Sequence, residues 1–230
     1  MTGMYTLSNK GVKKALSTAD GPGRSNVSAE VRPGDLASVL KAVRACRLCA
    51  AELPHEPRPV VRASSSASLL IVGQAPGTRV HASGLPFDDP SGDRLRQWLQ
   101  IEREQFYDES LVAFLPMGLC FPGQNASGGD LPPMARCAPT WHGAVRAALS
   151  NVKLVLLVGR YAQAHYLGPR ARPTLTETVR CWRDYAPEYF PVPHPSWRNN
   201  AWLKRHPWFA EDVLPGLRGA ISGLRNGPDR

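Results

Sequence analysis

Four short apolar runs constrain the fold of this chain more than any other feature. They cover residues 68–73, 111–118, 152–159 and 189–196. Continuous apolar runs of this length are typical of strands that are buried on both faces. Amphipathic helical patterns lie around and between them, at residues 35–46, 91–99, 139–149, 160–167 and 208–224. Buried strands that alternate with helices predict an α/β fold with a parallel sheet covered on both sides.

Two unusual segments follow the first and the last of these runs. Gly73–Gly77 reads Gly-Gln-Ala-Pro-Gly, and His194–Asn199 reads His-Pro-Ser-Trp-Arg-Asn. The carboxyl ends of parallel strands share one edge of the sheet, so we expect both segments to contribute to one site. Gly73–Gly77 lacks the Lys-Ser/Thr pair of a P-loop and the G-x-G-x-x-G pattern of a dinucleotide site. No nucleotide cofactor is therefore expected.

Aromatic, acidic and imidazole side chains near these segments suggest chemistry on a planar ring. Phe87 directly precedes Asp88 and Asp89. An aromatic side chain can stack on a base while a neighbouring carboxylate activates water. The alternative is that Asp89 only caps the helix that follows. His194 can stabilise a developing anion, or it can be a purely structural histidine.

The five cysteines predict either a metal centre or buried thiols. Cys46 and Cys49 form a C-x2-C pair, while Cys120 and Cys137 are separated by 16 residues. Four soft ligands suit a [4Fe–4S] cluster or a tetrahedral zinc ion, although four ordinary buried thiols fit the spacing as well. Cys181 is expected to be a buried thiol. Few cysteines, and an odd number, argue against an extracellular disulfide framework.

Charge and composition limit the possible partners. The chain has 28 Lys and Arg against 19 Asp and Glu, a net charge of +9, which favours an anionic partner such as nucleic acid or a membrane surface. It has no run long and apolar enough to span a bilayer and no secretory signal, so we expect a cytoplasmic protein. Residues 1–32 read as a flexible basic arm and residues 33–230 as one catalytic domain.

Taken together, these motifs resemble the uracil-DNA glycosylase superfamily, most closely its iron–sulfur families four and five. The matching features are Gly73–Gly77, Gly84–Phe87 followed by Asp89–Asp93, His194–Ser196 and the order of the four cysteines. The resemblance extends from about Asp35 to Arg225. It implies a three-layer α/β/α sandwich with a four-stranded parallel core sheet. It also implies hydrolysis of the N-glycosidic bond of a flipped deoxyuridine, which leaves an abasic site.

The resemblance also assigns roles to individual residues. A [4Fe–4S] cluster, with zinc as the alternative, would be held by Cys46, Cys49, Cys120 and Cys137. Catalysis would rest on Asp89 and His194. The residues expected to contact uracil are Gln74, Ala75, Phe87, Met117 and Gly118. Those expected to contact DNA are Pro76, Gly77, Pro195, Ser196, Arg198 and Asn199. The expected partner is uracil-containing DNA, bound by a monomer.

Three positions matter in comparison with the wider superfamily. Ala75 stands where other branches of the superfamily carry a water-activating Asp or an Asn. Families four and five share an alanine at this position. Gln74 replaces the Glu of family four, and Pro116 replaces an Asn that reads the uracil edge. Uracil selection is then expected to use backbone groups around Met117 and Gly118, or another side chain.

The resemblance to family five, which carries an Asp two residues before its Ser-Gly pair, implies Asp89 as the water-orienting carboxylate, with Asp88 and simple capping as alternatives. Two other functions remain open: a broader glycosylase for hypoxanthine or xanthine, and a damage-binding protein with little catalysis. Covalent attachment to DNA through His81 is disfavoured, because the segment around it lacks a basic run.

Overall fold

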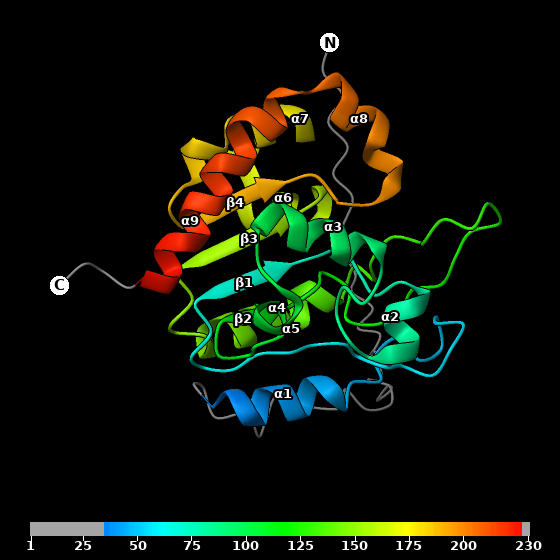
Figure 1. Cartoon of the computed structure of the whole chain (residues 1–230). Helices are drawn as coiled ribbons and strands as arrows, with labels where there is room; N and C mark the ends of the chain where they lie inside the picture. Colours follow the sequence, from blue (N-terminus) through cyan, green and yellow to red (C-terminus); the bar gives the residue numbers. More distant parts are fainter. Residues whose placement is uncertain (1–34, 227–230) are drawn as a thin grey trace, which may run out of the picture. The chain divides into compact units, whose positions relative to one another are not determined.

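A four-stranded parallel sheet forms the centre of the protein (Figure 1). The computed structural model describes residues 35–226, so the predicted arm at residues 1–32 lies outside the described part. The strands run in the spatial order β2 (Val112–Phe114), β1 (Leu69–Val72), β3 (Leu154–Val158) and β4 (Tyr189–Val192). Leu69 pairs with Val112 on one side and with Leu154 on the other, and Val155 pairs with Tyr189. The predicted four-stranded parallel sheet is confirmed.

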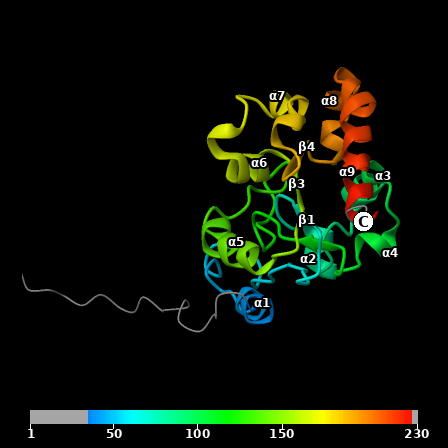
Figure 2. The same cartoon turned by 90° about the vertical axis from the view of Figure 1, so that its left-hand side faces the viewer.

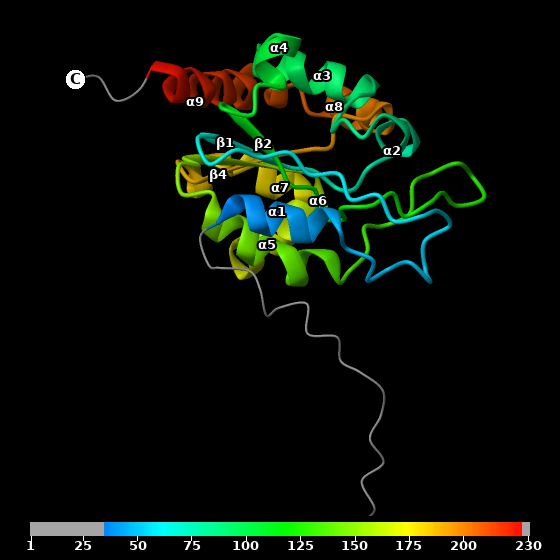
Figure 3. The ribbon, with the colours of Figure 1, turned by 90° about the horizontal axis from the view of Figure 1, so that it is seen from below.

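Helices cover both faces of this sheet (Figure 3). Leu70 and Val72 of β1 pack on one face, together with side chains of α1 (Leu36–Arg44), α5 (Cys137–Ala148) and α6 (Arg160–Leu167). Leu69 and Ile71 point to the opposite face, because successive side chains of a strand alternate. That face packs against α3 (Pro90–Leu99), α4 (Arg103–Phe106) and α9 (Leu214–Asn226). The chain therefore forms the predicted α/β/α layers.

The long helices begin and end where local chemistry favours it. The Asp35 carboxylate accepts hydrogen bonds from the backbone N–H of Ala37 at 3.1 Å and of Ser38 at 3.3 Å, which caps α1. The four apolar residues of α1 at three- and four-residue spacing are buried, and α1 lies beside α5 (Figure 2). The sequence pattern predicted α1, α3, α5 and α6 to within about two residues, the usual error at helix ends, whereas α9 begins six residues later than the predicted residue 208.

Several short helices were not predicted from the sequence. They are α2 (Thr78–Ser83), α7 (Leu175–Arg180) and α8 (Asn200–Arg205), together with α4. Each has at most six residues, too few to show a helical period. Residues 209–213 form a π-helical turn that continues into α9. Among residues 35–226, no helix has both the length and the apolar character that a bilayer crossing would require.

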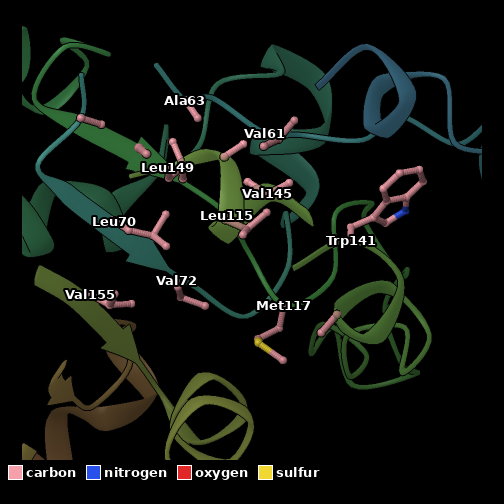
Figure 4. Packing of buried hydrophobic residues seen from close by; sticks show 14 of the residues in the cluster. Val61, Ala63, Leu70, Val72, Leu115, Met117, Trp141, Val145, Leu149 and Val155 are labelled. Carbon is pink, nitrogen blue, oxygen red and sulfur yellow. The ribbon is translucent and has the colours of Figure 1, made fainter. Parts of the chain in front are cut away.

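Strand β2 is shorter than the predicted run at residues 111–118. Its last sheet contact is the hydrogen bond of 3.1 Å from the Leu115 N–H to the Ile71 carbonyl. Beyond Pro116 the chain stays paired with the loop after β1, since the Met117 N–H donates to the Gly73 carbonyl at 3.0 Å. The Met117 side chain is buried and belongs to the same hydrophobic cluster as Leu115 and Trp141 (Figure 4).

Candidate active site

A pocket of about 800 Å³ opens at the carboxyl ends of the strands. Its walls come from the loop after β1, the turn between α2 and α3, Pro116, the loop at residues 124–130 and the segment after β4. Parallel sheets place their ligand sites at this edge. The structure thus brings the two unusual segments of the sequence to one site, as expected from their positions after β1 and β4.

Phe87 lies on the wall of the pocket in a constrained backbone conformation. Its φ of 55° is in the left-handed region, which a bulky residue rarely adopts. Its ring contacts the edge of Phe106, with centroids 6.2 Å apart, and a Cβ placed on Gly73 would come within 3.0 Å of the Phe87 ring. The ring is therefore pressed against the first residue of the Gly73–Gly77 loop. Backbone strain of the kind seen at Phe87 is typical of functional sites.

Asp89 combines the two roles that the sequence left open. It lines the pocket, and its Oδ1 accepts a hydrogen bond of 2.9 Å from the Gly92 N–H, which caps α3. No described residue bonds to its other carboxylate oxygen. Asp88, the alternative, pairs with Arg103 at 2.9 Å and is not among the pocket residues. Asp89 is therefore the carboxylate of this pair that can reach a ligand in the pocket.

His194 is positioned through its own backbone and through the turn that follows it. Its Nδ1 accepts a hydrogen bond of 3.3 Å from the Ser196 N–H, so the ring proton is on Nε2. Burial lowers the pKa of His194, while the negative charges of Asp89 and Asp130 act to raise it. The imidazole is therefore neutral at pH 7. It presents an Nε2–H to the pocket that no described residue accepts.

Basic and aromatic side chains surround the mouth of the pocket. Trp197 is 69% exposed, and the Arg198 guanidinium lies 5.1 Å from the centre of its ring. Arg94 of α3 donates to the Ser196 carbonyl at 3.2 Å and to the Asn200 side chain at 2.9 Å. These contacts attach α3 to the segment after β4. The arrangement offers positive charge and a stacking surface around a pocket that holds an aromatic ring, a neutral imidazole and a carboxylate.

Comparison with known families agrees with this geometry. The family model of the uracil DNA glycosylase superfamily matches residues 61–218, which include the whole sheet and all the pocket residues except Val60. The chain belongs to this superfamily. It is therefore a DNA glycosylase of base excision repair, and its macromolecular partner is DNA.

Only some of the residues that were predicted to contact uracil line the pocket of the glycosylase. Gln74 and Ala75 line the pocket, whereas Met117 and Gly118 do not. The Met117 N–H donates to the Gly73 carbonyl at 3.0 Å, and the Gly118 N–H donates to the Gln74 carbonyl at 2.9 Å. These two N–H groups therefore hold the Gly73–Gly77 loop in place, and a contact of Met117 or Gly118 with uracil stays a prediction.

All the residues of the glycosylase that were predicted to contact DNA lie on the pocket. Pro76, Gly77, Pro195, Ser196, Arg198 and Asn199 all line it. The Asn199 side-chain amide, however, donates to the His194 carbonyl at 2.6 Å. In this structure Asn199 therefore positions His194. The ring of His81 packs against His55 and Phe121, outside the pocket residues, in agreement with the disfavoured covalent role.

The sequence analysis missed one acidic residue of the glycosylase pocket. Asp130 lines the pocket, and its charge acts on His194 together with that of Asp89. It sits in the stretch Gly128–Pro133, where a single carboxylate is flanked by glycines and prolines. Such a segment signals a turn. That signal was present, but nothing in the sequence showed that the turn folds back to the pocket.

Four of the five cysteines lie near one another, away from the pocket. Cys46 and Cys49 follow α1, Cys120 follows β2, and Cys137 begins α5. Burial, followed by the charge of Cys137, raises the pKa of Cys49 to about 11, and Cys137 and Cys49 hydrogen-bond through their side chains. The charges of the other three thiols all act on Cys120.

Cys181 ends α7 and is partly exposed, so the expectation of a buried thiol is wrong; its charge is not among those that act on the other thiols. Within residues 35–226, no three or more His, Cys, Asp or Glu side chains are arranged to hold a metal ion. The four neighbouring thiols nevertheless provide the soft donor set that an iron–sulfur cluster or zinc requires.

Proposed function

We propose that this DNA glycosylase removes uracil from DNA and leaves an abasic site. The observation that carries the proposal is the combination, in one pocket, of the Phe87 ring, the free Nε2–H of neutral His194 and the Asp89 carboxylate. A base inside a duplex cannot reach such a pocket, so the nucleotide must be extruded, at a cost of a few kcal/mol. Stacking on Phe87 and contacts to the DNA backbone offset that cost.

The chemical step divides charge between the base and the sugar. When the C1′–N1 bond breaks, its electron pair leaves with uracil, and negative charge develops on the base oxygens. The Nε2–H of His194 donates a hydrogen bond to that developing charge. The ring can do so without a prior protonation, because its lowered pKa keeps it neutral and its Nδ1 is already held by the Ser196 N–H.

Asp89 orients and activates the attacking water. One of its oxygens is fixed by the capping bond to Gly92, which leaves the other oxygen to accept a proton from water as the new C1′–O bond forms. Capping and catalysis therefore use different oxygens of one carboxylate. The cap fixes the side chain in place for the reaction.

The Gln74 side chain takes over uracil recognition in the absence of the family Asn. It lines the pocket, and no described residue bonds to its amide group. Its carbonyl can accept the N3–H of uracil while its NH2 donates to O4. Since an amide can also pair with the edge of hypoxanthine, this observation favours deaminated purines as second substrates.

The four neighbouring cysteines hold a structural [4Fe–4S] cluster. When bound, the cluster supplies a cross-link between α1, the segment after β2 and α5. A cluster takes one thiolate at each of four irons, whereas zinc draws all four to one ion. The four thiols act on one another electrostatically, which supports one shared centre, with zinc as the alternative to the cluster. Anaerobically purified protein should then show broad visible absorbance and bound iron, and zinc in place of iron would contradict it.

The decisive experiment measures base release from DNA oligomers that carry one uracil, hypoxanthine or xanthine, followed by alkaline cleavage at abasic sites. We expect cleavage with uracil. The Asp89→Asn variant should lower the single-turnover rate by about 10²-fold or more, within the usual range for a positioned general base. Asp88→Asn, outside the pocket, is the matched control. Failure of the wild-type protein to release any of the three bases would refute the proposed function.

A further inference from the structure

The loop between Cys120 and Cys137 forms one wall of the pocket through residues 124–130. Gln124 and Asp130 pair as an antiparallel bridge, and the Leu131 N–H donates to the Gly123 carbonyl at 2.9 Å. Inside the turn, the Asn125 Oδ1 accepts hydrogen bonds from the backbone N–H of Ser127 at 3.1 Å and of Gly129 at 2.9 Å. The loop therefore has a defined shape of its own. It extends from the same end of the sheet as α2 (Figure 1).

This loop touches the two segments on either side of the pocket. At its tip, the Arg198 guanidinium donates to the Gly128 carbonyl at 3.4 Å. At its base, the Asp130 Oδ2 lies 3.2 Å from the position that a Cβ on Gly77 would occupy. Only glycine leaves normal space for the carboxylate at that point. Asp130 is thus held between the Gly73–Gly77 loop and the segment that carries His194.

The orientation of Asp130 leaves one oxygen available. Gln124 Nε2 donates to Oδ1 of Asp130 at 3.2 Å, and no described residue donates to Oδ2, the oxygen that faces Gly77. Among the described residues, Asp89 and Asp130 are the only acidic side chains that line the pocket. They belong to different elements, and both act electrostatically on His194.

Cleavage of an N-glycosidic bond needs an anion beside the sugar. As the C1′–N1 bond lengthens, positive charge develops on C1′ and the ring oxygen of the deoxyribose. His194 serves the departing base, and Asp89 is committed to α3 through one oxygen and to the water through the other. A fixed negative charge near the sugar would lower the barrier, because the charge is already in place when the cation forms.

We propose that Asp130 is a second catalytic carboxylate, which faces the deoxyribose of the flipped nucleotide and stabilises the positive charge that develops there. This inference rests on the proposed glycosylase function. Asp130 takes no proton in the step: the electron pair leaves with the base, water attacks C1′, and its proton passes to Asp89. The roles of the two carboxylates are therefore separable by experiment.

The test compares Asp130→Asn and Asp130→Glu with the wild-type protein in single-turnover assays on uracil-containing DNA. Asp130→Asn should lower the rate of base release by about tenfold or more, whereas Asp130→Glu, which keeps the charge, should retain more of the rate. Affinity for DNA with a non-cleavable 2′-fluorodeoxyuridine should not weaken. Glu104→Gln, an exposed carboxylate on α4, removes the same charge outside the pocket and should leave the rate unchanged.

Three outcomes would overturn the inference. One is an unchanged rate in Asp130→Asn with tighter DNA binding, which would make Asp130 only a charge that repels phosphate. Another is an equal loss in Asp130→Asn and Asp130→Glu, which would make its role one of loop shape. The third is an equal loss in Glu104→Gln, a general charge effect. An inactive wild-type protein would instead refute the glycosylase function itself.

Discussion

At the scale of single residues, the chemistry of the site depends on how His194 is held. Two neighbours fix it: the Ser196 N–H donates to Nδ1, and the Asn199 side-chain amide donates to the His194 backbone carbonyl. The sequence could predict that His194 matters, from its place after a buried strand. It could not predict the tautomer, because that depends on a turn geometry two residues further on.

Replacing His194 by Ala should lower the single-turnover rate of base release by about 10²-fold, the usual loss when one donor to a developing oxyanion is removed. His194→Gln should recover part of the rate, since an amide can also donate. Because burial lowers the pKa of His194, any loss of rate from its protonation should come at a lower pH than for a histidine of ordinary pKa, about 6.5.

His165→Ala is the control for this experiment, since His165 is exposed and lies outside the pocket. If His194→Ala reacts as fast as the wild-type protein, the imidazole does not act on the leaving base. The role assigned to it here would then be wrong.

At the scale of elements, the turn between α2 and α3 shows how the fold fixes a functional side chain. A Cβ placed on Gly92 would come within 1.8 Å of the Phe87 carbonyl oxygen, so α3 can approach the turn only because residue 92 is glycine. Phe87, the residue that Gly92 approaches, has a positive φ of 55°. The Ser-Gly pair that marks the family in the sequence thus has a steric reason.

Gly92→Ala should destabilise the protein by roughly 2 kcal/mol or more, because the added methyl group overlaps backbone and forces the turn or the helix to move. The free energy of unfolding in urea measures this. Gly143→Ala is the matched control: Gly143 lies inside α5, and nothing comes within 4 Å of its added Cβ. It should gain roughly 0.5–1 kcal/mol. Equal stability of the two variants would show that the turn yields without cost.

Elements also set the limit of what the sequence reveals. Apolar runs predict buried strands, and a helical period predicts the long helices. The order of these elements, and hence the edge of the sheet that carries the site, could therefore be predicted from the sequence. The loop at residues 124–130 has no period, and its fold depends on bonds such as those of the Asn125 side chain. For the same reason, the sequence could not show that Met117 and Gly118 lie outside the residues that line the pocket. Their N–H groups pair with the carbonyls of Gly73 and Gln74, and no local pattern encodes that pairing.

At the scale of the whole molecule, one buried histidine joins three parts of the fold. His142 of α5 is 2% exposed. Its Nδ1 lies 2.9 Å from the Tyr166 hydroxyl of α6, and its Nε2 lies 3.1 Å from the carbonyl of Pro116, a residue of the pocket wall. Burial lowers the pKa of His142 to about 4. Protonation of this ring is therefore coupled to the packing behind the active site.

The stability of the protein should fall in mild acid because of this histidine. Its pKa of about 4 in the folded state lies below the value of about 6.5 in the unfolded chain, so the unfolded state binds the proton more tightly. The contribution is fully present above pH 6.5 and is lost as the pH falls toward 4, by up to roughly 3 kcal/mol. Urea unfolding from pH 7 to 4 should show a smaller loss in His142→Gln than in the wild-type protein. His165→Gln, an exposed neighbour whose ring lies 5.4 Å from that of His142, should keep the wild-type slope. Parallel curves for His142→Gln and the wild-type protein would assign the acid sensitivity to other groups.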